Sequence, residues 1–514
     1  MIPSLANLLF LALFLSLSLS KGGFLLSDGD TGWHIKAGEF MLDTFSVLKH
    51  DIFSFTTPPL YWLNHQWLSE VIMAWIHQFF GLTGIVIFFA LIISLTYALL
   101  LKRIQKDQGN ILIAVFIILL AVASSIFHWF ARPHIFSLLF LTMSYYLLDF
   151  FQYQQVNRLY FFPPMMFFWI NMHGGFICGF ILIFTYLIGN LLKFITLKDE
   201  TQALYKQKTK ILTLTLMTTF FVSLINPYGV NALINPFTFV SNEFLMNHIS
   251  EFQSPNFHNP ILWPFLVFLL LMIFVTGASK RNLDIIEILL MIIFGGVALF
   301  SQRFITFFCI VAAPVLARNV DWILKRIHNR FVDILRKKSD ALCLIDASAR
   351  GTLWFVVGIS IVVSAVATDR IAYQFDENKK PVGAVNFLRK VSLEGNMFND
   401  DGFGGYLIYS AFPQYKVFID SRVDMYGVDR LRDYLSVVYF KPGWEDIVEK
   451  YDFRWVIFNA DSILSRHLAG RDDWKLIYSD KVANIFVRNI PENREIIKRY
   501  DKGDDCDRKT KYLH

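Results

Sequence analysis

Two acidic residues follow the first hydrophobic segment of the chain, at a position where carboxylates can do chemistry. Asp28 and Asp30 open the first long connecting segment, and Glu70 lies where the next hydrophobic run begins. A carboxylate pair at a bilayer surface costs free energy unless a metal, a cation or a catalytic task holds it there. Carboxylates coordinate a divalent metal such as Mg²⁺ or Mn²⁺, and they also accept a proton from a nucleophile. The three residues therefore indicate either a metal site or a general base.

Basic side chains and imidazoles lie at the ends of several later hydrophobic runs, on the side that is otherwise poor in cations. Positive groups of this kind neutralise the charge of a phosphate leaving group. Cations and carboxylates at one depth of the membrane are what a site for a phosphorylated lipid needs. The basic candidates are His128, Arg132, His134, His173 and Arg303, of which we expect all but His128 to bind a donor phosphate.

Each of these residues also has a purely structural interpretation. Arg132 and Arg303 can extend to lipid headgroups, and the histidines can be satisfied inside the fold. Asp28 can stabilise a turn, and Asp30 can cap the helix that follows. Glu70 can interact with the positive N-terminal end of its own helix. The convergence of all of them on one side of the membrane favours a common site.

Aromatic residues and imidazoles accompany the acidic residues in the first connecting segment. Tryptophan stacks on sugar faces, and it also anchors loops at the membrane interface, which is the commoner role at this depth. Both roles are open to Trp33, Trp62 and Trp67. The candidates for contact with an acceptor or a sugar are Trp33, His34, His65 and Trp67.

The composition indicates a polytopic membrane protein. Of 514 residues, 55% are hydrophobic and 17% aromatic, and only 18% are charged, against about 25% charged in an ordinary soluble domain. The four cysteines are far apart, which suggests neither a disulfide framework nor a zinc site. Basic residues do not gather on a polar domain, so nucleic acid is not an expected partner.

Apolar runs predict about eleven membrane-spanning helices. Basic residues occupy alternate connections between them, which places those connections and the N-terminus in the cytoplasm. We interpret the first run as a retained span rather than a cleaved signal, because the parity of the others requires it. The runs lie at roughly 3–20, 71–101, 111–130, 135–151, 159–171, 175–195, 211–225, 261–277, 284–300, 304–317 and 352–368.

The remaining segments define the predicted organisation. Residues 1–368 form the membrane domain, with outer loops at 21–70 and 226–260 that lie along the membrane surface. Residues 369–492 read as an extracytoplasmic α/β domain, because short β-like runs alternate with helical patterns. The charged segment 493–514 is expected to be a mobile tail.

The β-like runs of this domain are Tyr415–Ile419, Trp455–Phe458 and Ile485–Val487, and the helical patterns are Val382–Leu393 and Trp444–Tyr451. The segment Asn399–Tyr406 reads as a strand leading into a turn, in which Asp and Gly serve the backbone or contact a substrate. Arg422 has Asp420 and Asp424 beside it as alternative internal partners.

Motifs of several other enzyme classes are absent. The chain has no Gly-Lys-Ser/Thr phosphate loop, no Gly-x-Ser-x-Gly elbow and no His-Glu-x-x-His helix. ATP-driven transport, serine hydrolysis and zinc proteolysis are therefore disfavoured.

The layout resembles the GT-C superfamily of membrane glycosyltransferases, which includes oligosaccharyltransferases, protein mannosyltransferases and aminoarabinose transferases. The shared features are an acidic motif after the first span, a first outer loop along the membrane, many spans and a C-terminal outward α/β domain. Residues 28–38 with 67–70, and 399–406 with 418–422, look like the signatures of one bacterial group within it.

The resemblance implies a role for the acidic residues. In the superfamily an aspartate of the first outer loop acts as catalytic base or as a metal-linked activator, which maps onto Asp30, with Asp28 as its rival. Oligosaccharyltransferases recognise their acceptor through a Trp-Trp-Asp-Tyr-Gly motif. This chain has Asn399–Gly404 (Asn-Asp-Asp-Gly-Phe-Gly) instead, so recognition of an asparagine sequon is not implied.

The sequence as a whole predicts a polytopic, GT-C-like membrane enzyme in the bacterial inner membrane. It would move a sugar from a polyprenyl-phosphate or polyprenyl-diphosphate carrier in the bilayer to a glycan, lipid or protein acceptor at the outer face. The alternative is a non-catalytic subunit or a transporter of lipid-linked substrates. A transporter should depend on charges buried in its spans, and the sequence shows few away from the span ends.

Overall fold

The computed structural model describes residues 2–20, 23–107, 110–198, 200–349 and 352–500. The chain forms two compact units. The first consists of Met1–Lys21 and Thr83–Ala372, and the second of Gly22–Leu82 and Tyr373–His514. The first outer loop therefore folds together with the C-terminal region, whereas the sequence interpretation counted it with the membrane domain.

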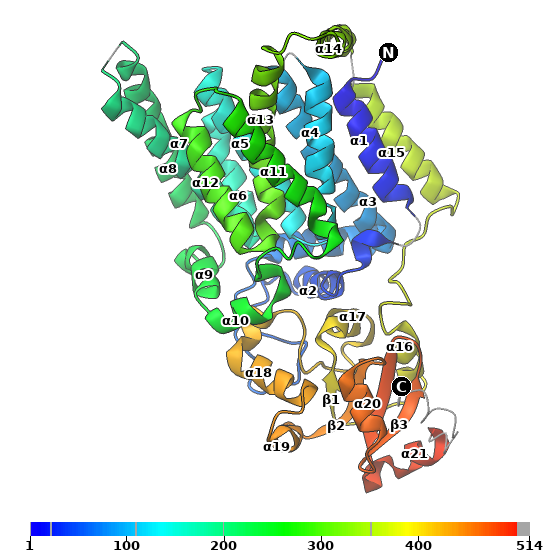
Figure 1. The fold of residues 1–514 in the computed structure, drawn as a ribbon. Helices are drawn as coiled ribbons and strands as arrows, with labels where there is room; N and C mark the ends of the chain where they lie inside the picture. Colours follow the sequence, from blue (N-terminus) through cyan, green and yellow to red (C-terminus); the bar gives the residue numbers. More distant parts are fainter. Residues whose placement is uncertain (1, 21–22, 108–109, 199, 350–351, 501–514) are drawn as a thin grey trace. The chain divides into compact units, whose positions relative to one another are not determined.

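The first unit is a bundle of helices, and each predicted apolar run overlaps a helix. Apolar runs in a membrane form helices because their backbone N–H and C=O groups must be satisfied within the segment. Figure 1 shows most of the helices of this unit side by side. The helices of the unit are α1 (Leu5–Leu19), the part of α3 (Trp67–Asp107) that follows Leu82, α4 (Ile111–Ala123), α5 (His134–Tyr153), α6 (Phe162–Met172), α7 (Ile177–Thr196), α8 (Gln202–Ser223), α9 (Val230–Val240), α10 (Glu243–His248), α11 (Trp263–Ala278), α12 (Ile285–Phe300), α13 (Ile305–Leu324), α14 (Arg330–Ser348) and α15 (Thr352–Ala367).

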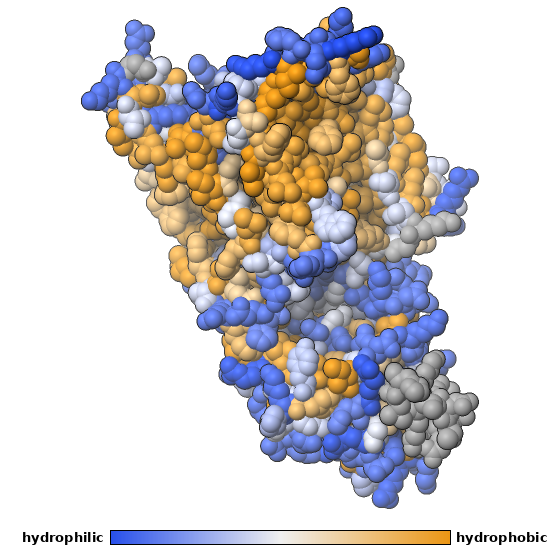
Figure 2. Space-filling view, in the orientation of Figure 1, coloured by the Kyte–Doolittle hydropathy of each residue, from blue (hydrophilic) through white to orange (hydrophobic). Residues whose placement is uncertain are grey.

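The described helices make the chain a multi-pass membrane protein. Five are long and apolar enough to cross a bilayer by themselves, and a sixth is added if the bent pair Arg330–Ser348 and Leu353–Ala367 is one span. Apolar helices of 10–17 residues, such as α1 and α12, accompany them. The number of eleven crossings stays a prediction. Figure 2 shows a hydrophobic surface over these helices and hydrophilic residues at the end where α14 lies.

Helix α3 passes from the second unit into the first and is broken at Gly81. The residue has φ +57° and ψ −159°, a conformation that glycine adopts readily because it has no Cβ.

The second unit contains a four-stranded sheet with helices around it. The strand order is β1-β2-β4-β3, with β1 parallel to β2 and the other neighbours antiparallel. The elements are α2 (Thr31–Thr44), the start of α3, α16 (Val382–Leu388), β1 (Asn396–Asn399), α17 (Asp401–Ala411), α18 (Val423–Val438), α19 (Trp444–Lys450), β2 (Phe453–Asn459), α20 (Ile463–Ala469), β3 (Trp474–Ser479), β4 (Ala483–Arg488) and α21 (Arg494–Tyr500).

The core of this unit lies along the central strands. Trp455, Val456 and Ile457 of β2 pair with Val487, Phe486 and Ile485 of β4, and all six side chains are buried. Because both strands are covered on both faces, they read as continuous apolar runs. The strand predictions at 455–458 and 485–487 are confirmed for this reason.

Two predictions for this unit are wrong. Tyr415–Ile419 is not a strand of the sheet. Val417 forms an isolated parallel bridge with Ser54, and the side chain of Asn399 binds the neighbouring backbone: Oδ1 accepts from Phe418 N–H (2.8 Å) and Nδ2 donates to the carbonyl of Ile419 (2.8 Å). The segment after Asn399 is a helix, α17, and not a turn.

The predicted tail begins with the helix α21. The remainder, residues 501–514, lies outside the described residues.

Candidate functional site

The acidic pair lies in a turn between a short 3-10 segment, η1 (Phe24–Leu26), and α2. The carboxylate of Asp28 accepts a hydrogen bond from Asp30 N–H at 2.7 Å, which is the turn-stabilising role open to it from the sequence. Asp30 is the N-cap residue of α2, but its side chain makes no capping hydrogen bond. Asp30 as a whole residue is only 7% exposed, so an interaction other than capping must account for its burial.

A lysine that the sequence analysis did not select lies beside this pair. Lys380 is 5% exposed, and its Nζ is 3.8 Å from the position that a Cβ on Gly29 would take. Burial lowers the pKa of Lys380, while the charges of Asp28, Asp30 and Asp400 oppose that shift. One ammonium and three carboxylates therefore interact in this part of the second unit.

Asp400 is the N-cap residue of α17, and its carboxyl accepts a hydrogen bond from Gly402 N–H at 2.9 Å. Burial and the neighbouring charge of Asp401 raise the pKa of Asp400 to about 7. Asp400 thus binds the backbone at this motif, which is one of the two roles considered from the sequence, and the pKa of the same carboxyl lies near neutral pH.

Direct backbone packing brings the two acidic motifs together. A Cβ on Gly32 would lie 2.4 Å from the carbonyl oxygen of Gly405, and a Cβ on Gly405 would lie 1.9 Å from the carbonyl oxygen of Gly29. No side chain fits at either position, because these separations are below any van der Waals contact. Glycine in both motifs is what lets α2 and α17 pack so closely.

The structure does not bring the three residues predicted to hold a metal, Asp28, Asp30 and Glu70, into one group. No group of three or more His, Cys, Asp or Glu side chains in the described part of the chain could hold a metal ion. Glu70 is fully buried and bound by Asn64 Nδ2 (2.6 Å) and by His34 Nδ1 (3.1 Å). The ammonium of Lys380 interacts with Asp28 and Asp30, and a divalent metal at this pair stays a prediction.

The aromatic residues of the first loop lie inside the second unit. Trp33 is 4% exposed, and its Nε1–H donates to Ser421 Oγ at 3.0 Å. His34 is also buried, whereas His65 and Trp67 are half-buried. Burial of Trp33 and Trp62 accounts for their apolar surface without a membrane interface or a sugar.

Arg422 fastens the first loop to the C-terminal region. Its guanidinium donates to Asp420 (2.6 and 2.8 Å), to Asp51 of the first loop (2.9 Å) and to the Tyr426 hydroxyl (3.2 Å). Burial raises the pKa of Asp51, but Arg422 and local hydrogen bonds outweigh it and lower the pKa. Of the two sequence neighbours weighed as partners of Arg422, Asp420 is the one that forms the ion pair.

The basic candidates gather in the first unit around a carboxylate. Arg132 Nη1 lies 3.0 Å from Glu251 Oε1, and Arg303 Nη1 lies 3.6 Å from Glu251 Oε2. Burial alone would raise the pKa of Glu251, but the two guanidinium groups hold it well below its usual range. Two guanidinium groups against one carboxylate leave a positive charge on the cluster.

The three histidines of this region differ in how they are held. His173 Nε2 lies 3.4 Å from Arg303 Nη2, so this imidazole is part of the cluster. His134 Nε2 lies 2.7 Å from the carbonyl oxygen of His128, so it is used inside its own turn. The rings of His128 and His134 are 4.5 Å apart, and those of His134 and His173 are 6.4 Å apart.

The loop at 226–260 is fixed to the turn that carries Arg303. Gln302 N–H donates to the carbonyl of Gln253 (2.9 Å), and the Ser301 hydroxyl donates to the carbonyl of Glu251 (3.1 Å). Glu251 lies in a 3-10 turn, η5 (Ser250–Phe252). Its position between the arginines is therefore set by backbone contacts as well as by charge.

Buried ion pairs lie near the other ends of the same helices. Arg103 of α3 pairs with Asp149 of α5, and Arg318 of α13 pairs with Glu287 of α12 at 2.8 Å. Arg281 also binds Glu287, at 2.9 Å. Each of these buried carboxylates has an internal guanidinium partner, which is the usual way that such charges are accommodated in a membrane protein.

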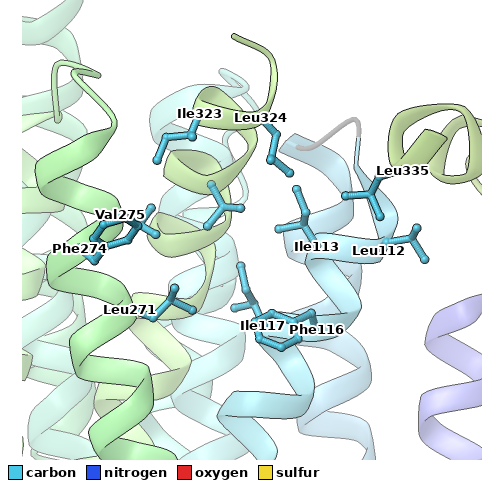
Figure 3. A pocket seen from close by; sticks show the side chains of 11 residues that line it. Leu112, Ile113, Phe116, Ile117, Leu271, Phe274, Val275, Ile323, Leu324 and Leu335 are labelled. Atoms are coloured by element: carbon cyan, nitrogen blue, oxygen red, sulfur yellow. The ribbon is translucent and has the colours of Figure 1, made fainter. Parts of the chain in front are cut away.

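An apolar groove of about 380 Å³ lies at that end of the bundle, between α4, α11, α13 and α14. Figure 3 shows its side chains, among them Ile113, Phe116, Leu271 and Leu335. It contains no ionisable side chain, so the groove can receive hydrocarbon but carries no chemistry.

The structure brings the predicted site residues together in two groups, one in each unit. Arg132, His134, His173 and Arg303 lie near one another in the first unit, and Asp28 and Asp30 share a turn in the second. Lys380 and Glu251 were missed. Lys380 follows another lysine in a polar stretch, and Glu251 was read only as part of a surface loop, so neither offered a local signal.

No family model matches the sequence, and no curated protein matches it. Two solved structures are similar in fold over nearly the whole chain. The archaeal oligosaccharyltransferase AglB from Archaeoglobus fulgidus, solved with an inhibitory peptide and a dolichol-phosphate, matches with a TM-score of 0.58 and 11% identity, over 95% of this chain and 74% of that one. ArnT from Cupriavidus metallidurans in the apo state matches with a TM-score of 0.50 and 12% identity, over 94% and 98%. Both are GT-C proteins, so the predicted fold class is confirmed.

Proposed function

We propose that this chain, whose fold is that of the GT-C membrane glycosyltransferases, moves a sugar from a polyprenyl-phosphate or polyprenyl-diphosphate donor to an acceptor at the outer face of the bacterial inner membrane. The proposal depends on one observation: Arg132 and Arg303 each form an ion pair with a different oxygen of the Glu251 carboxylate. A phosphate group also carries anionic oxygens, so the two guanidinium groups can bind it in the same way. The similar AglB structure contains dolichol-phosphate, a lipid phosphate.

The cations act on the leaving group. When the bond between the anomeric carbon and the phosphate oxygen breaks, the electron pair stays on the phosphate. Arg132, Arg303 and the His173 imidazole then stabilise the charge that develops there, because fixed donors in a partly dry site require little reorganisation. A phosphate oxygen would take the place that the Glu251 carboxylate holds between the two arginines.

Asp30 acts on the acceptor. Its carboxylate accepts the proton of the acceptor hydroxyl while the acceptor oxygen forms its bond to the anomeric carbon. Direct attack of this kind inverts the configuration at that carbon. Lys380 stabilises the negative charge of the surrounding carboxylates, and Asp28 keeps the turn that presents Asp30.

The test measures polyprenyl phosphate released from radiolabelled polyprenyl-phosphate sugars by purified protein in nanodiscs. We expect Asp30→Asn to lower release at least about 100-fold, since a general base contributes about 10²–10⁴. Asp43→Asn is the matched control, because Asp43 is an exposed residue of the same helix. A folded Asp30→Asn protein with full activity would refute the assignment of the base.

The arginines are tested in the same assay. Arg132→Met and Arg303→Met should weaken binding of the donor phosphate and slow its release, whereas Arg158→Met, at an exposed position outside the cluster, should do neither. A transporter or a non-catalytic subunit would bind the lipid donor and release no polyprenyl phosphate.

A further inference from the structure

The imidazole of His173 is held by two donors on the same ring nitrogen. His173 lies between α6 and the 3-10 segment η4 (Gly174–Phe176) and is 6% exposed. Gly175 N–H donates to its Nδ1 at 2.9 Å, and Ser137 Oγ of α5 lies 2.8 Å from the same atom. A Cβ on Gly175 would come within 2.5 Å of Ser137 Oγ, so glycine keeps the three groups together.

The direction of the Ser137 hydrogen bond follows from its other partner. Trp169 Nε1–H donates to Ser137 Oγ at 2.7 Å, and an indole nitrogen is a donor only. Ser137 therefore accepts from Trp169 and directs its own proton to Nδ1 of His173. Ser137 and Trp169 are both fully buried, so water does not compete for these bonds.

This arrangement selects one tautomer of the imidazole. A neutral imidazole carries its proton on one nitrogen, and the bond made by the other nitrogen decides which. Because Nδ1 accepts from Gly175 and Ser137, the proton lies on Nε2. That N–H faces the Arg303 guanidinium, with 3.4 Å between Nε2 and Nη2.

Two N–H groups that face each other 3.4 Å apart repel each other. The arrangement becomes favourable when one acceptor oxygen accepts a hydrogen bond from both. We infer that Ser137, oriented by Trp169, is a positioning residue that keeps His173 in its Nε2–H tautomer, so that His173 and Arg303 donate to the same oxygen of the lipid donor's phosphate. The inference rests on the proposed function for the identity of that phosphate.

The experiment uses the full chain in nanodiscs and reads the tautomer and the phosphate affinity separately. Nitrogen NMR of ¹⁵N-histidine-labelled protein reports the tautomer, with the His173 signals assigned by their loss in His173→Gln. The affinity is measured with a polyprenyl monophosphate between pH 6 and 8. The variants are Ser137→Ala and Trp169→Phe, which remove the hydroxyl and the donor that orients it.

Ser144→Ala is the matched control. Ser144 is two turns further along α5 and equally buried, and its hydroxyl has no hydrogen-bond partner among the described residues. It removes the same atom from the same helix without touching His173. All five proteins, wild type and the four variants, are first compared for monodispersity and thermal unfolding, and Trp169→Phe keeps the inference testable if Ser137→Ala does not fold.

Wild type and Ser144→Ala should show His173 only as the Nε2–H tautomer. Ser137→Ala should show a mixture of tautomers and bind polyprenyl monophosphate about five-fold more weakly, as expected for the loss of one neutral hydrogen bond. A single Nε2–H tautomer in both Ser137→Ala and Trp169→Phe overturns the inference. So does a mixture of tautomers with unchanged phosphate affinity.

The two proposals fail in different ways. If wild-type protein does not bind polyprenyl monophosphate at all, the proposed function fails and the phosphate in the inference fails with it. If wild type binds it and releases it from the sugar donor, but the tautomer does not depend on Ser137, the inference alone fails.

Discussion

Replacement of Glu251 by glutamine should strengthen the binding of a lipid phosphate. Glu251 is the anion that Arg132 and Arg303 bind in the structure, at 3.0 and 3.6 Å. A phosphate that binds to the arginines must replace this carboxylate and therefore loses the free energy of the internal ion pair. Glutamine has nearly the same shape but no charge, so the variant removes that competition.

The magnitude follows from the contacts and their exposure. At an effective dielectric constant of about 20, a unit-charge pair at 3–4 Å has a gross attraction of about 4–5 kcal/mol. The side chains of Arg132, Arg303 and Glu251 are 14%, 24% and 27% exposed, so desolvation and screening cancel most of it. A net effect of about 1–2 kcal/mol remains, which lies between exposed and fully buried pairs. The affinity for phosphate should rise about 5- to 30-fold.

The assay is equilibrium binding of a polyprenyl monophosphate to protein in nanodiscs, at low and high salt. The gain should shrink at high salt, because partly exposed charges are screened. Glu243→Gln is the matched control, since Glu243 is an exposed residue of the same loop. The two guanidinium groups lose their counter-ion in Glu251→Gln, so its melting temperature without ligand should fall. Weaker binding of phosphate by Glu251→Gln would refute the reasoning, because Glu251 would then assist the ligand.

Three further outcomes are expected from thermal unfolding of the full chain. Lys380→Met should destabilise the protein by about 3–5 kcal/mol at pH 7.5, because it removes the ammonium that interacts with Asp28, Asp30 and Asp400. The loss should be smaller at pH 5, where Asp400, whose pKa is raised to about 7, is protonated; a loss that does not depend on pH would contradict the charge argument. Gly405→Ala should lower the free energy of unfolding by about 1–3 kcal/mol, because the new Cβ would lie 1.9 Å from the carbonyl oxygen of Gly29. Gly470→Ala is the control and should leave the stability nearly unchanged, because its Cβ would lie 3.6 Å from the nearest atom, the carbonyl oxygen of His467. The pKa of Asp400 is about 7 in the folded state, above its unfolded value of about 3.9, so the protein loses stability through the ionisation of Asp400 as the pH rises from about 4 to 7. Asp400→Asn can still cap α17 and should remove that part of the pH dependence of stability. An unchanged pH profile would show that another group titrates.

The helical layout was predictable because it depends on local composition. Each of the apolar runs that suggested a span overlaps a helix, since a long apolar segment in a bilayer must satisfy its own backbone. The central strands β2 and β4 were predictable for a related reason, since both are apolar throughout. Tyr415–Ile419 has the same composition, but Asn399 binds its backbone, and no pattern within the segment shows that.

The residues of the basic cluster in the first unit were largely selected from the sequence, and those of the acidic turn in the second unit only in part. Arg132, His173 and Arg303 come at the ends of apolar runs, where an ionisable residue is conspicuous. Glu70 is equally conspicuous, but it is buried against His34 and Asn64, because residues 22–82 fold into the second unit.

By itself the sequence determined that the chain is a bundle of membrane helices with polar residues collected at their ends, because hydrophobicity and charge act residue by residue along the chain. Only the tertiary structure decided which charges meet. Glu251 reaches Arg132 from 119 positions away, and Lys380 reaches Asp28 and Asp30 from about 350 positions further along the chain. Such pairings depend on distances in space that local composition does not encode.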